Sequence, residues 1–103
     1  MLISDFLLTG EQNAQTAKQL CSYAKNAGVK LSKRQLSQAI EHERRQGIPI
    51  CASCDSKNPG YYLAADKGEM QRYCDSLRHR AGEIHATRRA CIKTIAHLPE
   101  REV

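Results

Sequence analysis

The motif "CASC" places the thiols of Cys51 and Cys54 at a spacing that zinc sites and redox-active dithiols use. Either chemistry needs both sulfur atoms on the same side of the chain. Residues 48–54 alternate in the period-two pattern of a β-strand, in which residues three apart point to opposite faces. The remaining cysteines are single: Cys21, Cys74 and Cys91. We therefore expect no metal and no reactive thiol, and we interpret most of the cysteines as small buried residues.

Other arrangements of catalytic residues do not stand out in the sequence. It shows no paired carboxylates, no nucleophile beside a base and no glycine-rich phosphate loop. The histidines share no ligand spacing and are expected at the surface: His42, His79, His85 and His97. We therefore expect a non-enzymatic protein with no cofactor and no small-molecule substrate.

The composition is that of one small folded protein. Its 103 residues suffice for a single domain with a modest core, and 41% hydrophobic and 26% charged residues are ordinary for a globular chain. No segment is long enough to span a membrane, and the opening "MLISDFLL" is too short for a signal peptide and contains Asp5. These features predict a cytoplasmic protein with reduced thiols.

The net charge of +5 comes mainly from two segments. Residues 30–47 contain five Lys and Arg against two Asp and Glu, and residues 67–103 contain eight against five. Both segments have helical patterns, so the positive charge is expected on helices. A basic surface favours polyanionic partners.

The first half of the chain predicts short helices. Apolar residues within 3–7 share one face of the first, which stops at Gly10. The second is expected to begin at a cap on Asn13 and to end near Asn26.

The third expected helix begins at the capping residue Ser32, buries Leu36 and Ile40, and runs to about Gln46. Two short helices joined by a few residues are typical of a helix-turn-helix. The turn residues "DSKNPG" then separate two β-patterned runs, which predicts a small hairpin.

The words "LSKRQLSQAIEHERRQGIPI" and "NPGYYLA" resemble winged helix-turn-helix proteins of the phage and prophage regulator type. The resemblance implies a mainly α fold with a small β-hairpin. It assigns residues 1–66 to a winged helix-turn-helix core, about 32–46 to the recognition helix and about 48–65 to the wing. It also implies a regulator of transcription or replication that binds duplex DNA. One position departs from the pattern, because Glu43 stands where such proteins commonly carry leucine. Either this end of the helix is more exposed, or Glu43 pairs with a nearby arginine.

The face of the third helix opposite Leu36 and Ile40 suits the major groove, because arginine pairs with guanine and glutamine pairs with adenine. The residues of this helix expected to contact DNA are Ser32, Lys33, Arg34, Ser37, Gln38, Glu41 and Arg45. From the hairpin turn, Lys57 with Asn58 is expected to reach the DNA backbone or the minor groove. The alternative is a solvated surface, since Glu41 repels phosphates unless it accepts a hydrogen bond from cytosine.

Residues 67–99 predict a long C-terminal helix, followed by a tail at 100–103. Asp66 and Glu69 form a capping-box pattern, and apolar residues follow with heptad spacing. A helix of about 48 Å exceeds what one small domain covers. Its first half is therefore expected to pack on the winged core and its second half to pair with a second copy of the chain. The residues expected to form this homodimer are Ile84, Cys91, Ile95 and Leu98.

Two alternatives remain, one for this helix and one for the whole protein. The helix could instead kink at Gly82, so that the chain folds back onto its own core. The whole protein could also be an interaction module, in which the winged domain binds no DNA and the heptad helix docks onto another protein.

Overall fold

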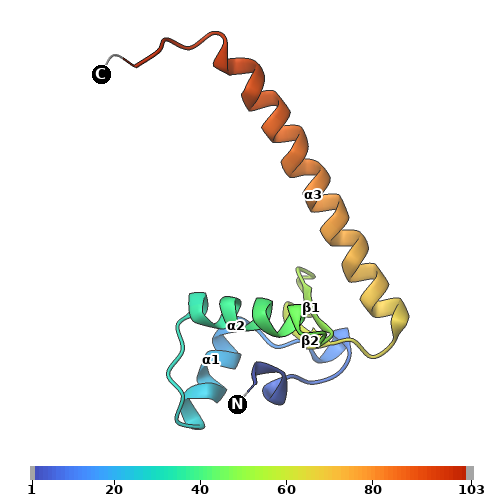
Figure 1. Ribbon diagram of the computed structural model, residues 1–103. Helices are drawn as coiled ribbons and strands as arrows, with labels where there is room; N and C mark the ends of the chain where they lie inside the picture. The colour runs from blue at the N-terminus through green and yellow to red at the C-terminus, as the bar shows by residue number, and fades with distance from the viewer. Residues whose placement is uncertain (1, 102–103) are drawn as a thin grey trace. The chain divides into compact units, whose positions relative to one another are not determined.

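The computed structural model describes residues 2–101 and is mainly helical, with one two-stranded hairpin and a long C-terminal helix (Figure 1). The elements, in which η denotes a 3₁₀-helix, are η1 (Ile3–Phe6), η2 (Glu11–Asn13), α1 (Ala17–Asn26), α2 (Lys33–Arg45), β1 (Ile50–Ser53), β2 (Gly60–Leu63) and α3 (Lys67–Ile95). The chain divides into two compact units, the first ending at Tyr73 and the second beginning at Cys74. No helix in the described range is long and apolar enough to cross a lipid bilayer.

The start of α1 differs from the prediction. Thr16, not Asn13, is the N-cap: its hydroxyl accepts a hydrogen bond from the Gln19 amide at 3.2 Å, and the Gln19 side chain accepts one from the Thr16 amide at 2.9 Å. This reciprocal pair satisfies two amides that the first turn of a helix leaves without partners. Asn13 ends η2, and its side chain donates to the Thr9 carbonyl at 2.8 Å.

The start of α2 agrees with the prediction. Ser32 accepts from the Gln35 amide at 3.1 Å, and the Gln35 side chain accepts from the Ser32 amide at 2.9 Å. Leu36 and Ile40 are almost completely buried, as the apolar stripe predicts. They pack in one core cluster whose other buried members are Ile3, Leu7, Leu20 and Ile50.

The first expected helix is only the single turn η1, and Glu43 of α2 holds it. The Glu43 carboxylate accepts from the Ile3 amide at 2.7 Å and from the Ser4 amide at 2.9 Å. Glu43 as a whole is only 3% exposed. Both sequence-based expectations for Glu43, an exposed helix end and a pairing with arginine, are therefore wrong. A leucine here would leave the two amides of η1 without this acceptor.

The hairpin joins two parts of the core. β1 and β2 are antiparallel, with Cys51 opposite Tyr62, and the segment before α1 adds a bridge in which Gln15 and Tyr61 exchange backbone hydrogen bonds of 2.9 and 2.8 Å. Ile50 lies in the cluster with α2, whereas Cys51 lies in a second cluster with Tyr62 and Tyr73. Both faces of β1 are thus covered where the strand begins.

The cysteines are less buried than the sequence suggested. Only Cys51 is buried; Cys21 is intermediate, and Cys54, Cys74 and Cys91 are exposed. Cys51 lies in β1 and is buried, whereas Cys54 follows the end of the strand at Ser53 and is exposed. Between residues 2 and 101, no three His, Cys, Asp or Glu side chains are grouped so that they could hold a metal ion.

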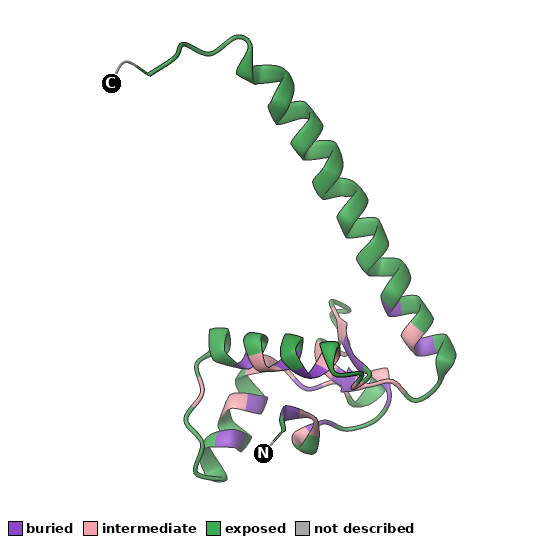
Figure 2. Ribbon diagram, in the orientation of Figure 1, coloured by how far each residue is buried: buried purple, intermediate pink, exposed green. Residues whose placement is uncertain are grey.

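The helix α3 begins at a cap but stands largely uncovered. Asp66 accepts from the Glu69 amide at 2.9 Å, while the Glu69 carboxylate accepts from Ala65 at 2.8 Å and from Glu11 at 3.1 Å instead of completing the capping box. Buried residues on α3 are confined to Glu69 and Tyr73. Residues 74–101 are all exposed (Figure 2).

The far end of α3 also differs in detail from the prediction. Helical structure continues through Gly82 without interruption, so no fold-back occurs at this glycine. The helix ends at Ile95, and a turn with a 3.3 Å hydrogen bond from the Leu98 amide to the Ile95 carbonyl follows. The predicted tail is described as far as residue 101; its last two residues lie outside the described range.

Candidate nucleic-acid interface

One exposed stripe runs along α2 on the side away from the core. Arg34, Gln38, Glu41 and Arg45 are exposed, and at about 100° per residue they lie opposite the buried stripe of Leu36 and Ile40. From its first to its last member the stripe spans about 16 Å. The core therefore fixes which face of α2 points outward.

The other expected contact residues at the start of α2 are exposed too. Lys33 and Ser37 are both accessible to a ligand. Ser32 is exposed, and its oxygen already accepts the capping hydrogen bond, which leaves its hydroxyl proton able to donate to a phosphate. Lys30, two residues before this cap, is a further exposed cation that we did not include among the expected contacts.

Glu41 sits among cations on this face. Its carboxylate lies 3.3 Å from Nε of Arg45 and 3.8 Å from a guanidinium nitrogen of Arg44. The Arg45 side chain is 80% exposed, so its pairing with Glu41 is weak and open to exchange. Glu41 thus reduces the positive potential of the stripe and competes with any anion for Arg45.

Arg44, the neighbour of Arg45, has a structural position that we did not predict. Its Nε donates to the Ile50 carbonyl at 2.8 Å, and its guanidinium carbon lies 5.0 Å from the centre of the Tyr73 ring. Its buried Nη2 has no hydrogen-bond partner. Spacing could have revealed this, because Arg44 follows the buried Ile40 by four residues and falls near the core face.

The hairpin tip presents one accessible cation. A turn is formed where the Asp55 side chain accepts from the Lys57 amide at 3.0 Å and the Ser53 hydroxyl accepts from the Asp55 amide at 3.1 Å. Lys57 is exposed, whereas Asn58 is half-buried and less available. In the view of Figure 2, the hairpin tip and the exposed turns of α2 lie on the same, upper side of the first unit.

A group of titratable side chains gathers away from this stripe. The Tyr62 hydroxyl donates to the Glu11 carboxylate at 3.4 Å. Burial raises the pKa of the Tyr62 hydroxyl, and the nearby Cys51, Glu11 and Glu69 raise it further. A neutral Tyr62 acts as a hydrogen-bond donor and not as a base. The hydrogen bond between Tyr62 and Glu11 connects η2 to β2, and we assign this group a structural role and no ligand-binding role.

The chain matches no family model, no curated protein and no solved structure. The function must therefore be argued from the geometry of these residues.

Proposed function

We propose that this protein is a non-enzymatic, winged-helix-type binder of duplex DNA, a regulator of transcription or replication of the phage or prophage type. The observation that carries the proposal is the exposed stripe of Arg34, Gln38 and Arg45 on a capped helix whose opposite face buries Leu36 and Ile40. An α-helix fits the major groove, and these side-chain types form the bidentate bonds that distinguish base pairs there.

Phosphate contacts complete the proposed mode of binding. Lys33 lies in the first turn of α2, where the helix N-terminus also favours an anion. Lys57, exposed at the hairpin tip, would contact the DNA backbone that flanks the site in the major groove. These contacts fix the position of the protein, while the stripe on α2 reads the bases.

The proposal is tested by titrating the full chain into a labelled pool of random duplexes by fluorescence anisotropy, at about 50 and 200 mM salt. Binding is expected to weaken steeply with salt, after which the preferred site is selected from the pool. Absence of binding at low salt contradicts the proposal. Equal affinity for all sequences after thorough selection contradicts base reading by α2.

Replacement of Arg34 by alanine is expected to weaken binding to the selected site by about 5- to 100-fold and to relax the preference at one base pair. Arg34→Lys is the matched control, because it keeps the charge but loses the two-pronged hydrogen bond. If Arg34→Lys binds like the wild type, and both variants keep the wild-type base preference, Arg34 contacts only phosphate.

Replacement of Lys57 by alanine should weaken binding to all DNA sequences by the same factor. It should also reduce by about one the slope of the logarithm of affinity against the logarithm of salt concentration, because one phosphate contact is lost.

Replacement of Glu41 by glutamine is expected to tighten binding to random duplexes by about three- to tenfold at low salt, with a smaller gain at high salt. The change removes the carboxylate that pairs with Arg45 and repels phosphates. Anisotropy titrations measure the effect, and Glu83→Gln on α3 is the control that makes the same chemical change in the second unit. Weaker binding confined to the selected site would show instead that Glu41 accepts a hydrogen bond from a base.

The second candidate function is a protein-interaction module, favoured by the uncovered apolar side chains of α3. Leu77, Ile84, Ile92 and Ile95 are between 42% and 67% exposed. The homodimer expected from the sequence would use this same face. This function predicts stable protein association without salt-sensitive DNA binding.

A further inference from the structure

An apolar stripe runs along the second unit with nothing in that unit to cover it. Ile84, Ile95 and Leu98 are each about two-thirds exposed, at 67%, 66% and 65%. In proteins, a helix gains most of its stability from packing its apolar face against other residues. The stripe therefore indicates a partner helix.

The stripe follows a heptad repeat, which defines the residues that a partner helix would meet. Its inner positions are Cys74, Leu77, Ala81, Ile84, Arg88, Cys91, Ile95 and Leu98. Its flanking positions are Arg78, Arg80, His85, Thr87, Ile92 and Thr94. The charged residues in this set, apart from the titratable histidine, are Arg78, Arg80 and Arg88. All are exposed cations, and no carboxylate occurs at any of these positions.

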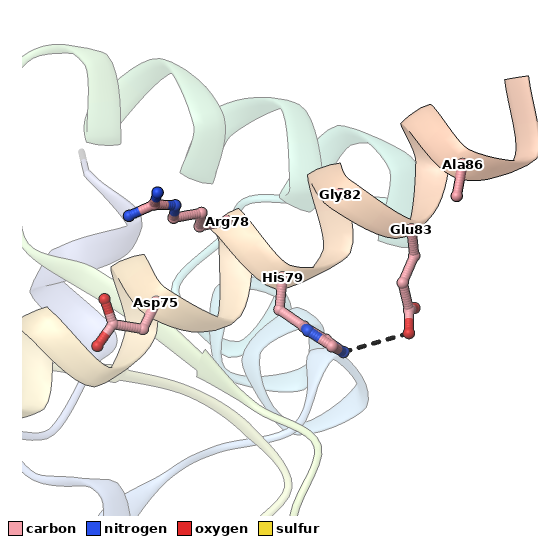
Figure 3. Close-up of a pocket in the computed structure, with 6 residues that line it drawn as sticks. All are labelled: Asp75, Arg78, His79, Gly82, Glu83 and Ala86. Atoms are coloured by element: carbon pink, nitrogen blue, oxygen red, sulfur yellow. Dashed lines mark ion pairs between the residues drawn. The ribbon is translucent and has the colours of Figure 1, made fainter. Parts of the chain in front are cut away.

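The carboxylates of this part of α3 lie outside the stripe. Asp75 and Glu83 occupy positions beyond the flanks. The Glu83 carboxylate is 3.2 Å from the His79 ring nitrogen, and Figure 3 shows the two side chains pointing toward each other beside Gly82 and Ala86. Glu83 is thus engaged along a different face from the one that Ile84 presents.

A second copy of the chain is a poor match for this stripe. In a parallel pair, Arg88 at an inner position would face its own counterpart, which places two cations together in an apolar seam. In an antiparallel pair the arginines of both helices would still line one interface without a carboxylate. Like charges at these positions destabilise pairing, and opposite charges select the partner.

We propose that this stripe on α3 binds an acidic amphipathic helix of another protein. The apolar face of that helix covers Leu77, Ile84 and Ile95, and its flanking glutamates or aspartates pair with Arg78, Arg80 and Arg88. The homodimer predicted from the sequence is the competing occupant. This inference is independent of DNA binding by α2, because it uses no residue of the first unit.

Two synthetic four-heptad peptides test the proposal with the full chain. Both carry leucine and isoleucine at the inner positions; one has glutamate and the other lysine at every flanking position. In anisotropy titrations the acidic peptide is expected to bind at least about tenfold more tightly than the basic one, with an affinity that falls as salt rises. Equal binding of the two peptides, or binding of neither, overturns the proposal.

Matched variants show whether the peptide uses the stripe. Arg88→Glu should weaken binding of the acidic peptide at least about tenfold, whereas Arg89→Glu, the same change one residue outside the stripe, should weaken it by no more than about threefold. Ile84→Ala should also weaken it about tenfold, because apolar contact is lost. An unaffected Ile84→Ala variant would reduce the interaction to charge alone and overturn the proposal. Far-UV circular dichroism checks that each variant remains helical.

Sedimentation velocity of the chain alone decides between the two occupants. A monomer at about 10 μM is expected, since the arginines oppose self-association. A stable dimer that Arg88→Leu tightens further would assign the stripe to a second copy and overturn the proposal. Arg34→Ala should leave peptide binding unchanged, so failure of DNA binding and failure of this inference are distinguished.

Discussion

Replacement of Glu43 by leucine is expected to lower the free energy of unfolding of the first unit by about 2–4 kcal/mol. Leucine suits the apolar surroundings of this site, but the amides of Ile3 and Ser4 lose a charged acceptor at 2.7 and 2.9 Å. Burying an amide without an acceptor lowers the free energy of unfolding by more than the apolar contacts of leucine raise it. Glu43→Gln should fall between the wild type and leucine, because it keeps one acceptor oxygen.

Urea unfolding followed by tyrosine fluorescence measures this effect on the first unit alone. All of the tyrosines lie there, at positions 23, 61, 62 and 73, and the chain has no tryptophan. Glu41→Leu, two residues away on the exposed face, is the control and should change stability by less than about 0.5 kcal/mol. Equal stability of Glu43→Leu and the wild type would mean that water replaces the carboxylate at η1. Hydrogen exchange at the Ile3 and Ser4 amides would then be faster than in the wild type, because an amide in contact with water is not protected.

Replacement of Gly60 by alanine is expected to destabilise the same unit by about 3 kcal/mol or more. Gly60 has φ of 118°, and an added Cβ would overlap the Gln15 carbonyl and the Thr16 amide nitrogen. This is where the hairpin contacts the segment that leads into α1, so relief of the overlap must disturb the paired hydrogen bonds between Gln15 and Tyr61.

Two other glycines serve as controls for Gly60. Gly28 has φ of 88° with nothing within 4 Å of an added Cβ, so Gly28→Ala should cost only the backbone strain of about 1–2 kcal/mol. Gly82 lies in the open interior of α3, and Gly82→Ala should raise helix stability by about 0.5–1 kcal/mol. Urea midpoints compare Gly60→Ala with Gly28→Ala, and thermal circular dichroism follows Gly82→Ala. A Gly60→Ala midpoint no lower than that of Gly28→Ala would contradict the close approach to Gln15.

The parts of the fold that depend on neighbouring residues could be predicted from the sequence. Ser32 and Gln35 cap α2 through contacts three residues apart, and the stripe of Leu36 and Ile40 sets its buried face. The Thr16-x-x-Gln19 capping box carries the same signal and marks the start of α1, whereas Asn13 has no such partner three residues on. The exposed stripe on α2 followed from the same helical spacing, whereas its binding to DNA stays a prediction.

The parts that depend on distant residues could not be predicted. Glu43 contacts an amide 40 residues earlier, and Glu69 contacts one 58 residues earlier. A charged residue at a helical position gives no indication of which backbone group it will accept from. Likewise, the exposure of Cys74 and Cys91 follows from where the first unit ends, which apolar spacing alone does not reveal.

The two carboxylates that hold the N-terminal segment also constrain the order of folding. During synthesis, the residues of η1 and η2 leave the ribosome before their acceptors Glu43 and Glu69, which follow 40 and 58 residues later. Closing such long loops is slower than forming a local helical turn. The helices α1 and α2 can therefore form early. The segment of η1 and η2 then docks last and completes the first unit.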